Sequence, residues 1–241
     1  MNVALINTNR IQPPIAPIGL DYIGEAAHAA GHRVRLLDLC WAEEASVTSV
    51  GATLVGATLV APAIAAFFRD AEFDLVGMTL RNTDDCAYTS RASFVESFAE
   101  LALHVRRHTD ARLVLGGVGF SVMPEQILAY LERAHGLAFD AGIWGEGEFA
   151  LVGLLARLEQ GDEWRDTPSL VYRGADGTWR RNPPVAHALT NLPAMSRRWV
   201  DNPRYFRRGG QAGIETKRGC PGACVYCADP LAKGAHLRLR P

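Results

Sequence analysis

The sequence predicts an open α/β fold with a mostly parallel sheet, followed by a smaller C-terminal segment. Short apolar runs alternate with helix-like stretches over roughly the first 155 residues. Each run is too short for a helix, is rich in Val, Leu and Ile, and is followed by Gly, Asn or Asp, which is typical of strands buried on both faces. The expected strands are Val3–Asn7, Val34–Leu39, Leu75–Leu80, Leu113–Gly117 and Ala141–Gly145.

The stretches between these runs have helical periodicity. The clearest is Ser93–His108, in which Phe94, Phe98, Leu101 and Val105 recur at three- and four-residue spacing and form one apolar stripe. The expected helices are Leu20–Ala30, Ala61–Ala71, Ser93–His108 and Glu125–His135.

Composition narrows the class of protein. The net charge of −1 argues against nucleic acid as a partner, and the basic tail after Arg197 is explained equally well by a solvated face or an anionic ligand. The uncharged run Ser46–Phe68 holds two glycines and Pro62, so we expect a buried crossover helix with an irregular lead-in rather than a membrane span. The chain begins without a signal peptide, and beyond three clustered cysteines only Cys40 and Cys86 remain, which indicates a reducing cytoplasm.

The loops that follow the predicted strands carry the polar and glycine residues. Open α/β sheets bind ligands outside the carboxyl ends of their strands, so these loops meet at one edge. Glycine allows positive φ and lets the backbone approach a bulky ligand closely. The four loops of interest are Asn7–Arg10, Arg81–Asp85, Gly116–Ser121 and Gly145–Glu148.

The α/β pattern ends near Arg157. Ser169–Arg173 and Thr178–Arg181 flank a glycine-rich turn and predict a β-hairpin, and a stretch rich in proline and arginine follows. Ala212–Lys217 is expected to form one more strand that leads into the cysteines. We therefore divide the chain into an α/β domain (1–155), a linker with a hairpin (156–210) and a C-terminal segment (211–241).

Cys220, Cys224 and Cys227 form a C-x₃-C-x₂-C array. Iron–sulfur clusters are held by thiolates from such short loops, and three thiolates leave one iron of a [4Fe–4S] cluster open to a ligand. Structural zinc is the alternative, with His236 as the fourth ligand, but closed zinc sites usually use paired C-x₂-C motifs.

The array resembles the signature of the radical S-adenosylmethionine (radical SAM) superfamily, including Tyr226 before the third cysteine. In that superfamily the aromatic lies against the adenine of SAM, and the open iron binds the amino and carboxylate groups of SAM. The loops upstream resemble the cobalamin-binding domain found in front of many radical SAM enzymes, a flavodoxin- or Rossmann-like sheet. The order of these loops and the cysteine array along the chain is similar to that of class B, cobalamin-dependent radical SAM proteins.

This resemblance implies a [4Fe–4S] cluster, cobalamin and SAM as cofactors. The sequence has no Asp-x-His-x-x-Gly motif, so cobalamin is expected to bind with its own base displaced and no protein histidine on cobalt. Arg81 is the expected catalytic residue, facing the cobalt, with pairing to Asp84 or Asp85 as the structural alternative. Glu146 is expected to contact corrin amides, or else Glu146 and Glu148 stabilise a helix N-terminus. The expected cofactor contacts are Thr8, Asn9, Pro17, Leu80, Arg81, Asn82, Gly116, Gly117, Val118, Gly119, Phe120, Ser121, Glu146 and Tyr226.

The implied reaction is methyl transfer to a small-molecule or peptide substrate, with an electron donor of the flavodoxin or ferredoxin type. Three alternatives stay open: a radical rearrangement or cyclisation, a non-catalytic corrinoid-binding or sensory module, and a tRNA methylthiotransferase. The last would need three more cysteine ligands in the N-terminal domain, where only Cys40 and Cys86 are available. Because the family's barrel normally continues well past the cysteines, we expect a chain ending at Pro241 to be a fragment.

Overall fold

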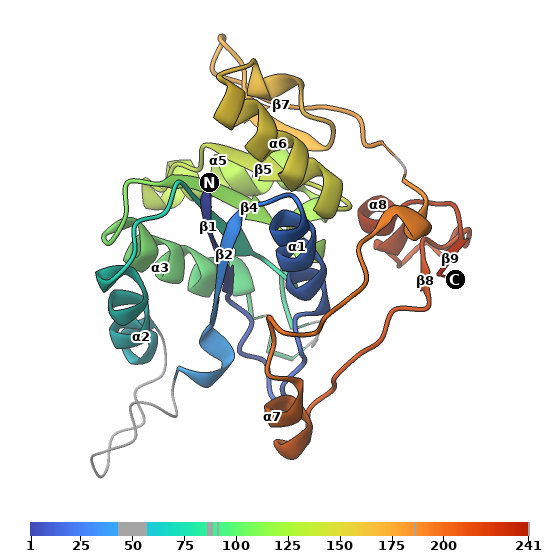
Figure 1. Cartoon of the computed structure of the whole chain (residues 1–241), viewed down its shortest axis with the longest axis horizontal. Coiled ribbons are helices and arrows are strands. Elements are labelled where there is room, and N and C mark those ends of the chain that lie inside the picture. The colour runs from blue at the N-terminus through green and yellow to red at the C-terminus, as the bar shows by residue number, and fades with distance from the viewer. Residues whose placement is uncertain (43–56, 86–88, 91, 186, 241) are drawn as a thin grey trace.

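A computed structural model describes the chain except for residues 43–56, 86–88, 91, 186 and 241. Its centre is a seven-stranded sheet in the order β2-β1-β3-β4-β5-β6-β7 (Figure 1). The first five strands are parallel and confirm the expected α/β fold, and their order 2-1-3-4-5 is that of flavodoxin-like sheets. They are β1 (Asn2–Asn7), β2 (Arg33–Asp38), β3 (Leu75–Thr79), β4 (Arg112–Gly116) and β5 (Ala141–Ile143).

The sheet is covered by helices on both faces (Figure 1). Successive strand residues point to opposite faces, so Val3 and Leu5 pack with α1 (Ile18–Ala29) and α6 (Glu148–Gln160). The residues between them pack on the other side, against α2 (Ala57–Arg69), α3 (Phe94–Arg106) and α5 (Pro124–His135). Burial on both faces explains why the strands are continuous apolar runs.

The helix ends follow local sequence rules. The Ser93 hydroxyl accepts a hydrogen bond from Val95 N at 3.3 Å and begins α3, and Pro124 occupies the first turn of α5. Gly136 and Gly161 end α5 and α6 in the left-handed conformation. No helix in the described ranges is long and apolar enough to span a bilayer. Residues 46–56 of the uncharged run, and Cys86, lie outside these ranges.

The predicted hairpin forms, with β6 (Leu170–Arg173) antiparallel to β7 (Trp179–Arg181), after the short turn η3 (Trp164–Asp166). The hairpin also extends the central sheet, because β6 pairs antiparallel with β5, with Ile143 opposite Leu170. Strand β5 would otherwise present a row of unpaired backbone groups at the sheet edge.

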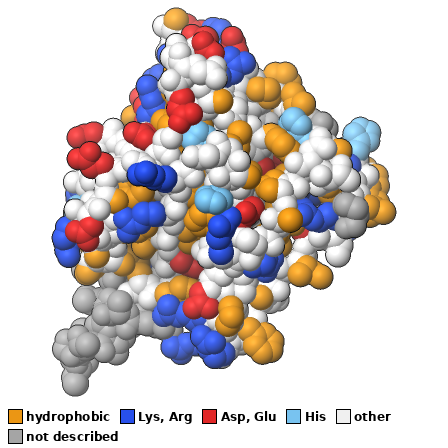
Figure 2. All heavy atoms as spheres, viewed as in Figure 1, with side chains coloured by type: hydrophobic (Ala, Val, Ile, Leu, Met, Phe, Trp, Pro, Cys, Tyr) orange, Lys and Arg blue, Asp and Glu red, His pale blue; other side chains and the backbone are white. Residues whose placement is uncertain are grey.

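The rest of the chain is arranged around short elements. These are η4 (Leu189–Asn191), α7 (Asn202–Arg207), β8 (Lys217–Arg218), α8 (Asp229–Lys233) and β9 (Arg238–Leu239). The prediction of a strand over Ala212–Lys217 is wrong for all but its last residue, since only β8 pairs, antiparallel to β9. An extended segment becomes a strand only where a neighbour takes its backbone hydrogen bonds, and residues 212–216 have no such strand among the described residues. On the face seen in Figure 2, acidic and basic side chains are interspersed.

Candidate cofactor site

The carboxyl ends of four parallel strands form one row. Asn7 is in register with Asp38 of β2 and Thr79 of β3, and Thr79 is in register with Gly116 of β4. The chain crosses to opposite sides of the sheet from β1 and from β3, so the topological switch point, where sheets of this kind bind ligands, lies between the loops that follow these two strands. The structure therefore brings together the predicted residues at 8–9, 80–82 and 117–121, and we call this row and its loops the carboxyl edge.

The loops after β3 and β4 touch backbone to backbone. Gly117 has φ 108°, and a Cβ there would lie 2.5 Å from the Leu80 carbonyl oxygen. A Cβ on Gly119 would lie 2.9 Å from the Asn82 Cα, and Gly119 N donates to Arg81 O at 2.9 Å. Both glycines are thus required by a close approach that any side chain would block.

The glycine-rich segment contains a single helical turn, α4 (Val118–Val122), where the sequence predicts only a loop. Val118 is exposed, whereas Phe120 is fully buried, its ring against Gly142 of β5. The Ser121 hydroxyl donates to Gly117 O at 2.8 Å and accepts from Gly145 N at 2.9 Å. Phe120 and Ser121 therefore hold the carboxyl edge together from inside.

The loop after β1 is also held by its own side chains. The Thr8 hydroxyl donates to the Thr79 carbonyl, and Asn9 Oδ1 accepts from Ile11 N at 3.4 Å. Asn9 is 8% exposed, and its Nδ2 has no hydrogen-bond partner among the described residues. A buried donor without an acceptor is costly, so this amide marks a place where a ligand could supply one. Pro17 lies at the N-terminus of α1, after this loop.

Arg81 is half-buried where the chain leaves β3. Its Nη1 donates to Asn82 Oδ1 at 3.0 Å, and the structure records no ion pair between Arg81 and Asp84 or Asp85, all three being described residues. The structural alternative considered for Arg81 therefore does not form. A guanidinium cannot be a metal ligand, so Arg81 contributes a fixed positive charge to the carboxyl edge.

The loop after β5 contacts the cysteine segment through ion pairs. Arg218 is 9% exposed, and its Nη2 lies 2.5 Å from Glu148 Oε1 and its Nε 2.7 Å from Glu215 Oε1. Glu146, expected at the corrin, pairs here with Arg238 and lies 3.4 Å from Arg218. Burial opposes the charge on Arg218, but its bonds to Glu148 and Glu215 outweigh that effect and raise its pKa.

Sequence reasoning missed Arg218 and Arg238 as part of the site. The available signal was the pair of acidic residues after β5 together with basic residues on both sides of the cysteines. Figure 1 shows the α8–β8–β9 segment beside the sheet, and α8 packs on α4. The two sides of the cysteine loop are thus attached to the loops after β4 and β5.

The cysteine loop itself is open at its tip. A Cβ on Gly219, which has φ 79°, would lie 2.0 Å from the His236 carbonyl oxygen, and Cys220 N donates to Gly234 O at 3.1 Å. Beyond this anchor, Cys224, Tyr226 and Cys227 are exposed. The stacking surface expected of Tyr226 is therefore uncovered.

The thiols only partly converge. The Sγ atoms of Cys220 and Cys224 lie 3.4 and 3.7 Å from the position of a Cβ on Gly222. Across the described ranges no three His, Cys, Asp or Glu side chains are grouped closely enough to hold a metal ion, and His236 is exposed. Cys220, Cys224 and Cys227 are free thiols within eight residues, which is the donor set of an iron–sulfur cluster.

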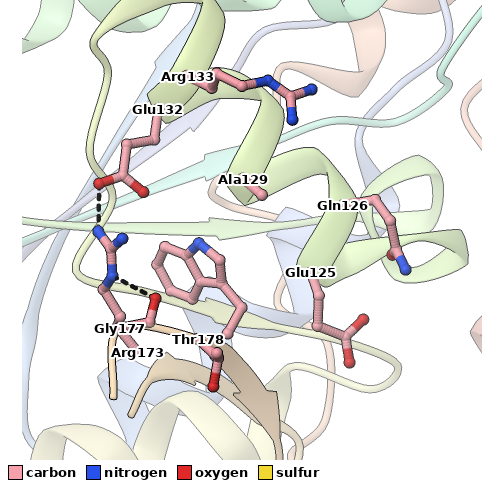
Figure 3. Close-up of a pocket in the computed structure, with 9 residues that line it drawn as sticks. Glu125, Gln126, Ala129, Glu132, Arg133, Arg173, Gly177 and Thr178 are labelled. Carbon is pink, nitrogen blue, oxygen red and sulfur yellow. Dashed lines mark hydrogen bonds and ion pairs between the residues drawn. The ribbon is translucent and has the colours of Figure 1, made fainter. Parts of the chain in front are cut away.

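A separate groove of about 610 Å³ lies between α5 and the β6–β7 hairpin (Figure 3). Both acidic residues that line it are paired: Glu132 contacts Arg173, and Glu125 lies 3.0 Å from Arg181. Arg173 also donates from Nε to the Gly177 carbonyl at 2.9 Å. None of the predicted site residues lines it, so it is no part of the carboxyl edge.

Comparison with known proteins agrees with this geometry. Residues 5–155 match the family described as B12 binding domain. The chain is 31% identical to tryptophan 2-C-methyltransferase of Streptomyces laurentii, over 99% of this chain and 45% of the relative. The structure of the radical S-adenosylmethionine methyltransferase TsrM from Kitasatospora setae, with cobalamin and a [4Fe–4S] cluster bound, superposes with a TM-score of 0.81 at 30% identity, over 100% of this chain and 43% of that chain.

A third similarity concerns the fold alone. The cobalamin-dependent S-adenosylmethionine radical enzyme OxsB superposes with a TM-score of 0.70 at 18% identity, over 99% of this chain and 29% of that chain. The chain thus spans less than half the length of these relatives. The family match covers well over half of the chain, which belongs to the B12-binding domain family and is similar along its length to cobalamin-dependent radical SAM enzymes.

Proposed function

We propose that this chain is the cobalamin-binding domain and cluster segment of a cobalamin-dependent radical SAM methyltransferase. One observation carries the proposal: the cysteine segment is attached to the same sheet edge that a cobalamin would occupy, through Arg218 on Glu148 and through α8 on α4. A methyl carrier and the cluster that binds its methyl donor must lie on one side of the protein. We place the domain boundaries at 1–155, 156–210 and 211–241.

The carboxyl edge fits a cobalamin. Asn9 provides a buried amide donor that has no partner in the part of the chain that the structure describes. Gly117 and Gly119 bring two loop backbones to within contact distance where a flat ring system could lie over them. Thr8, Asn82 and Val118 line the same edge, and Arg81 adds a positive charge. When bound, cobalamin supplies a cobalt centre that accepts and releases a methyl group, while the protein supplies position and charge.

The cysteine segment would hold the cluster through Cys220, Cys224 and Cys227, with Tyr226 available to the adenine of SAM. Tryptophan is the substrate named for the Streptomyces relative's activity and in a second TsrM structure. By that likeness we propose a small-molecule substrate for the whole protein, an electron donor of the flavodoxin or ferredoxin type, and a reducing cytoplasmic setting. The described cysteines are free thiols, which supports the last point.

Two measurements on the full chain test the proposal. Anaerobic reconstitution should incorporate about four iron atoms and four sulfides per chain, and substitution of all three cysteines by Ala should abolish this uptake. Hydroxocobalamin should bind, and the EPR spectrum of its Co(II) state should lack splitting from an axial nitrogen. Stoichiometric zinc without iron would contradict the cluster. Cobalamin binding without iron uptake would leave the non-catalytic corrinoid module as the better description.

A further inference from the structure

The helix α7 lies in the linker, yet its Tyr205 reaches the carboxyl edge. The Tyr205 side chain is fully buried, and its hydroxyl donates to Asp38 Oδ2 at 2.8 Å. Asn7 Nδ2 donates to Asp38 Oδ1 at 2.8 Å and lies 3.4 Å from the Tyr205 oxygen. Three residues from β1, β2 and α7 thus form one hydrogen-bonded group at the ends of two adjacent strands.

This group continues into the loop after β1. Asn7 Oδ1 accepts from Asn9 N at 3.2 Å, so the side chain that Asp38 orients also sets the backbone at Asn9. On its far side, Asp38 Oδ1 accepts from Cys40 N at 3.2 Å. The Asp38 carboxylate that the Tyr205 hydroxyl contacts through Oδ2 therefore also holds Asn7 and Cys40 through Oδ1.

The direction of the Tyr205 hydrogen bond is settled by its surroundings. Burial, and then the neighbouring Asp38 carboxylate, raise the pKa of Tyr205 well above its ordinary value, so the phenol stays protonated and donates. Burial also raises the pKa of Asp38, against the hydrogen bonds from Asn7 and Tyr205 that lower it. The ring is held by Trp41, edge to face, at 4.6 Å between ring centroids.

Two residues that follow α7, Gly210 and Gln211, hold the other end of the same loop as well. Ala16 N donates to Gln211 O at 2.9 Å, and Gln211 N donates to Pro14 O at 3.0 Å. A Cβ on Gly210 would lie 2.3 Å from Pro14 O, so the two backbones are in close contact. The segment between Asn7 and Ala16 is therefore held at one end by Tyr205 of α7 and at the other by Gly210 and Gln211, which follow this helix.

We propose that Tyr205 is a positioning residue for the cobalamin-binding edge, acting through Asp38 and Asn7 on the loop that carries Thr8 and Asn9. The inference rests on the proposed function, because the ligand it positions the loop for is cobalamin. It assigns a role in the cofactor site to a residue of the linker, 198 positions from Asn7 in sequence.

The test is made on the full chain by titration with hydroxocobalamin. Tyr205→Phe should weaken binding about tenfold, since it leaves a buried carboxylate oxygen without its donor and frees Asn7 to move. Tyr130→Phe is the matched control, because Tyr130 also donates to a carboxylate, that of Glu96, but on α5 away from the edge. It should stay within about twofold of the parent. Equal affinity of parent and Tyr205→Phe would overturn the proposal.

A double-variant cycle separates the relay from a general loss of stability. In an Asn7→Ala background, Tyr205→Phe should have little further effect on the dissociation constant, because the intermediate is already missing. Fully additive effects would overturn the relay through Asn7. If Tyr205→Phe does not fold, two variants of Asp38 make the same test. Asp38→Asn keeps hydrogen-bonding groups at this position and should retain most of the cobalamin affinity. Asp38→Ala removes these groups and should lose the affinity. Equal losses would overturn the proposal.

A measurement without cofactor distinguishes this inference from the proposed function. In the cobalamin-free chain, the amides of residues 8–11 should exchange with solvent faster in Tyr205→Phe than in the parent or in Tyr130→Phe. A parent chain that binds no hydroxocobalamin overturns the proposed function and the cofactor part of this inference. Unchanged exchange overturns the positioning role itself.

Discussion

The loop after β4 and the cysteine loop both begin at a glycine with positive φ, but they are built differently beyond it. After Gly117, Phe120 and Ser121 are buried and hydrogen-bonded to the neighbouring loops. After Gly219, the residues Cys224 to Cys227 are exposed. The carboxyl edge is thus preformed by the protein, whereas the cysteine loop is anchored at its two sides and left open at its tip.

This difference indicates what fixes the geometry of each region: packing and hydrogen bonds at the carboxyl edge, and bonds to a metal at the cysteine loop. Rigid, satisfied loops on a packed sheet are suited to a large cofactor that must find its site ready. A loop of thiols in solvent has few contacts of its own, and the bonds between thiolates and iron are strong enough to order it. We therefore expect the two regions to respond differently to substitution and to metal.

The largest effect is expected at Gly117. Gly117→Ala places a Cβ 2.5 Å from the Leu80 carbonyl oxygen in a backbone conformation that Ala rarely adopts, so the loops after β3 and β4 must separate. Hydroxocobalamin binding should fall by about a hundredfold, for about 3 kcal/mol of strain and displacement. Gly153→Ala on α6 is the control, since the nearest atom to its Cβ would be Thr167 Cγ2 at 3.7 Å, and it should bind almost normally. Equal behaviour of the two variants would mean that this edge is not preformed.

The next effect is expected at the joint between the regions. Arg218→Gln leaves Glu148 buried without its cation, which should lower the free energy of unfolding by about 3 kcal/mol in denaturant titration. Arg180→Gln removes an exposed pair with Asp176 and should leave the free energy of unfolding almost unchanged. Iron uptake should fall in Arg218→Gln while cobalamin affinity changes less. A larger loss of cobalamin than of iron would show that Arg218 serves the preformed edge instead.

Arg81 tests whether the preformed edge also sets the chemistry of its cofactor. A fixed positive charge near cobalt favours its more reduced states, so Arg81→Gln should make the Co(II)/Co(I) potential more negative by some tens of millivolts. Affinity should stay nearly unchanged, because the side chain of Arg81 makes only one hydrogen bond in the described chain, to Asn82. Spectroelectrochemical titration of the bound cobalamin measures this potential. Tight cobalamin binding with an unchanged Co(II)/Co(I) potential would mean that Arg81 only stabilises its own loop.

The smallest effect concerns the linker that joins the regions. Asp21 of α1 is buried, and Arg197 of the linker lies 3.4 Å from one of its carboxylate oxygens. Burial raises the pKa of Asp21, against the lowering effect of Arg197. Since the folded state favours the protonated acid, the stability contribution is present at low pH and is lost as the pH rises through the raised pKa.

Asp21→Asn should therefore unfold at a higher temperature than the parent at neutral pH. The gain is expected to be about 2–4 °C, for about 1 kcal/mol, and should vanish as the pH falls to the ordinary range of an aspartic acid. Melting curves across pH check this. A lower melting temperature for Asp21→Asn at neutral pH would mean that the ion pair with Arg197 outweighs the cost of burial.

Much of the fold and part of the site follow from the sequence by itself. Three kinds of signal act over only a few residues: the apolar runs of β1 and β3 to β5, the apolar stripe of α3, and the glycines at 117, 136 and 161. The sheet, its helices and the loops of its carboxyl edge could therefore be predicted. The spacing of Cys220, Cys224 and Cys227 indicated a metal cofactor for the same reason, because the ligands are close in the chain.

Other features depend on residues far apart in sequence, and only the tertiary structure decided them. The pairing of β6 with β5, the Arg218–Glu148 ion pair and the Tyr205–Asp38 hydrogen bond join positions about 30 to 170 residues apart, and nothing local marks one partner for the other. A buried hydrogen bond or ion pair forms where two chain segments happen to exclude water together. The sequence alone therefore predicted the cofactors, and packing decided that a linker tyrosine lies at the ends of β1 and β2 and that an arginine beside the cysteines pairs with the loop after β5.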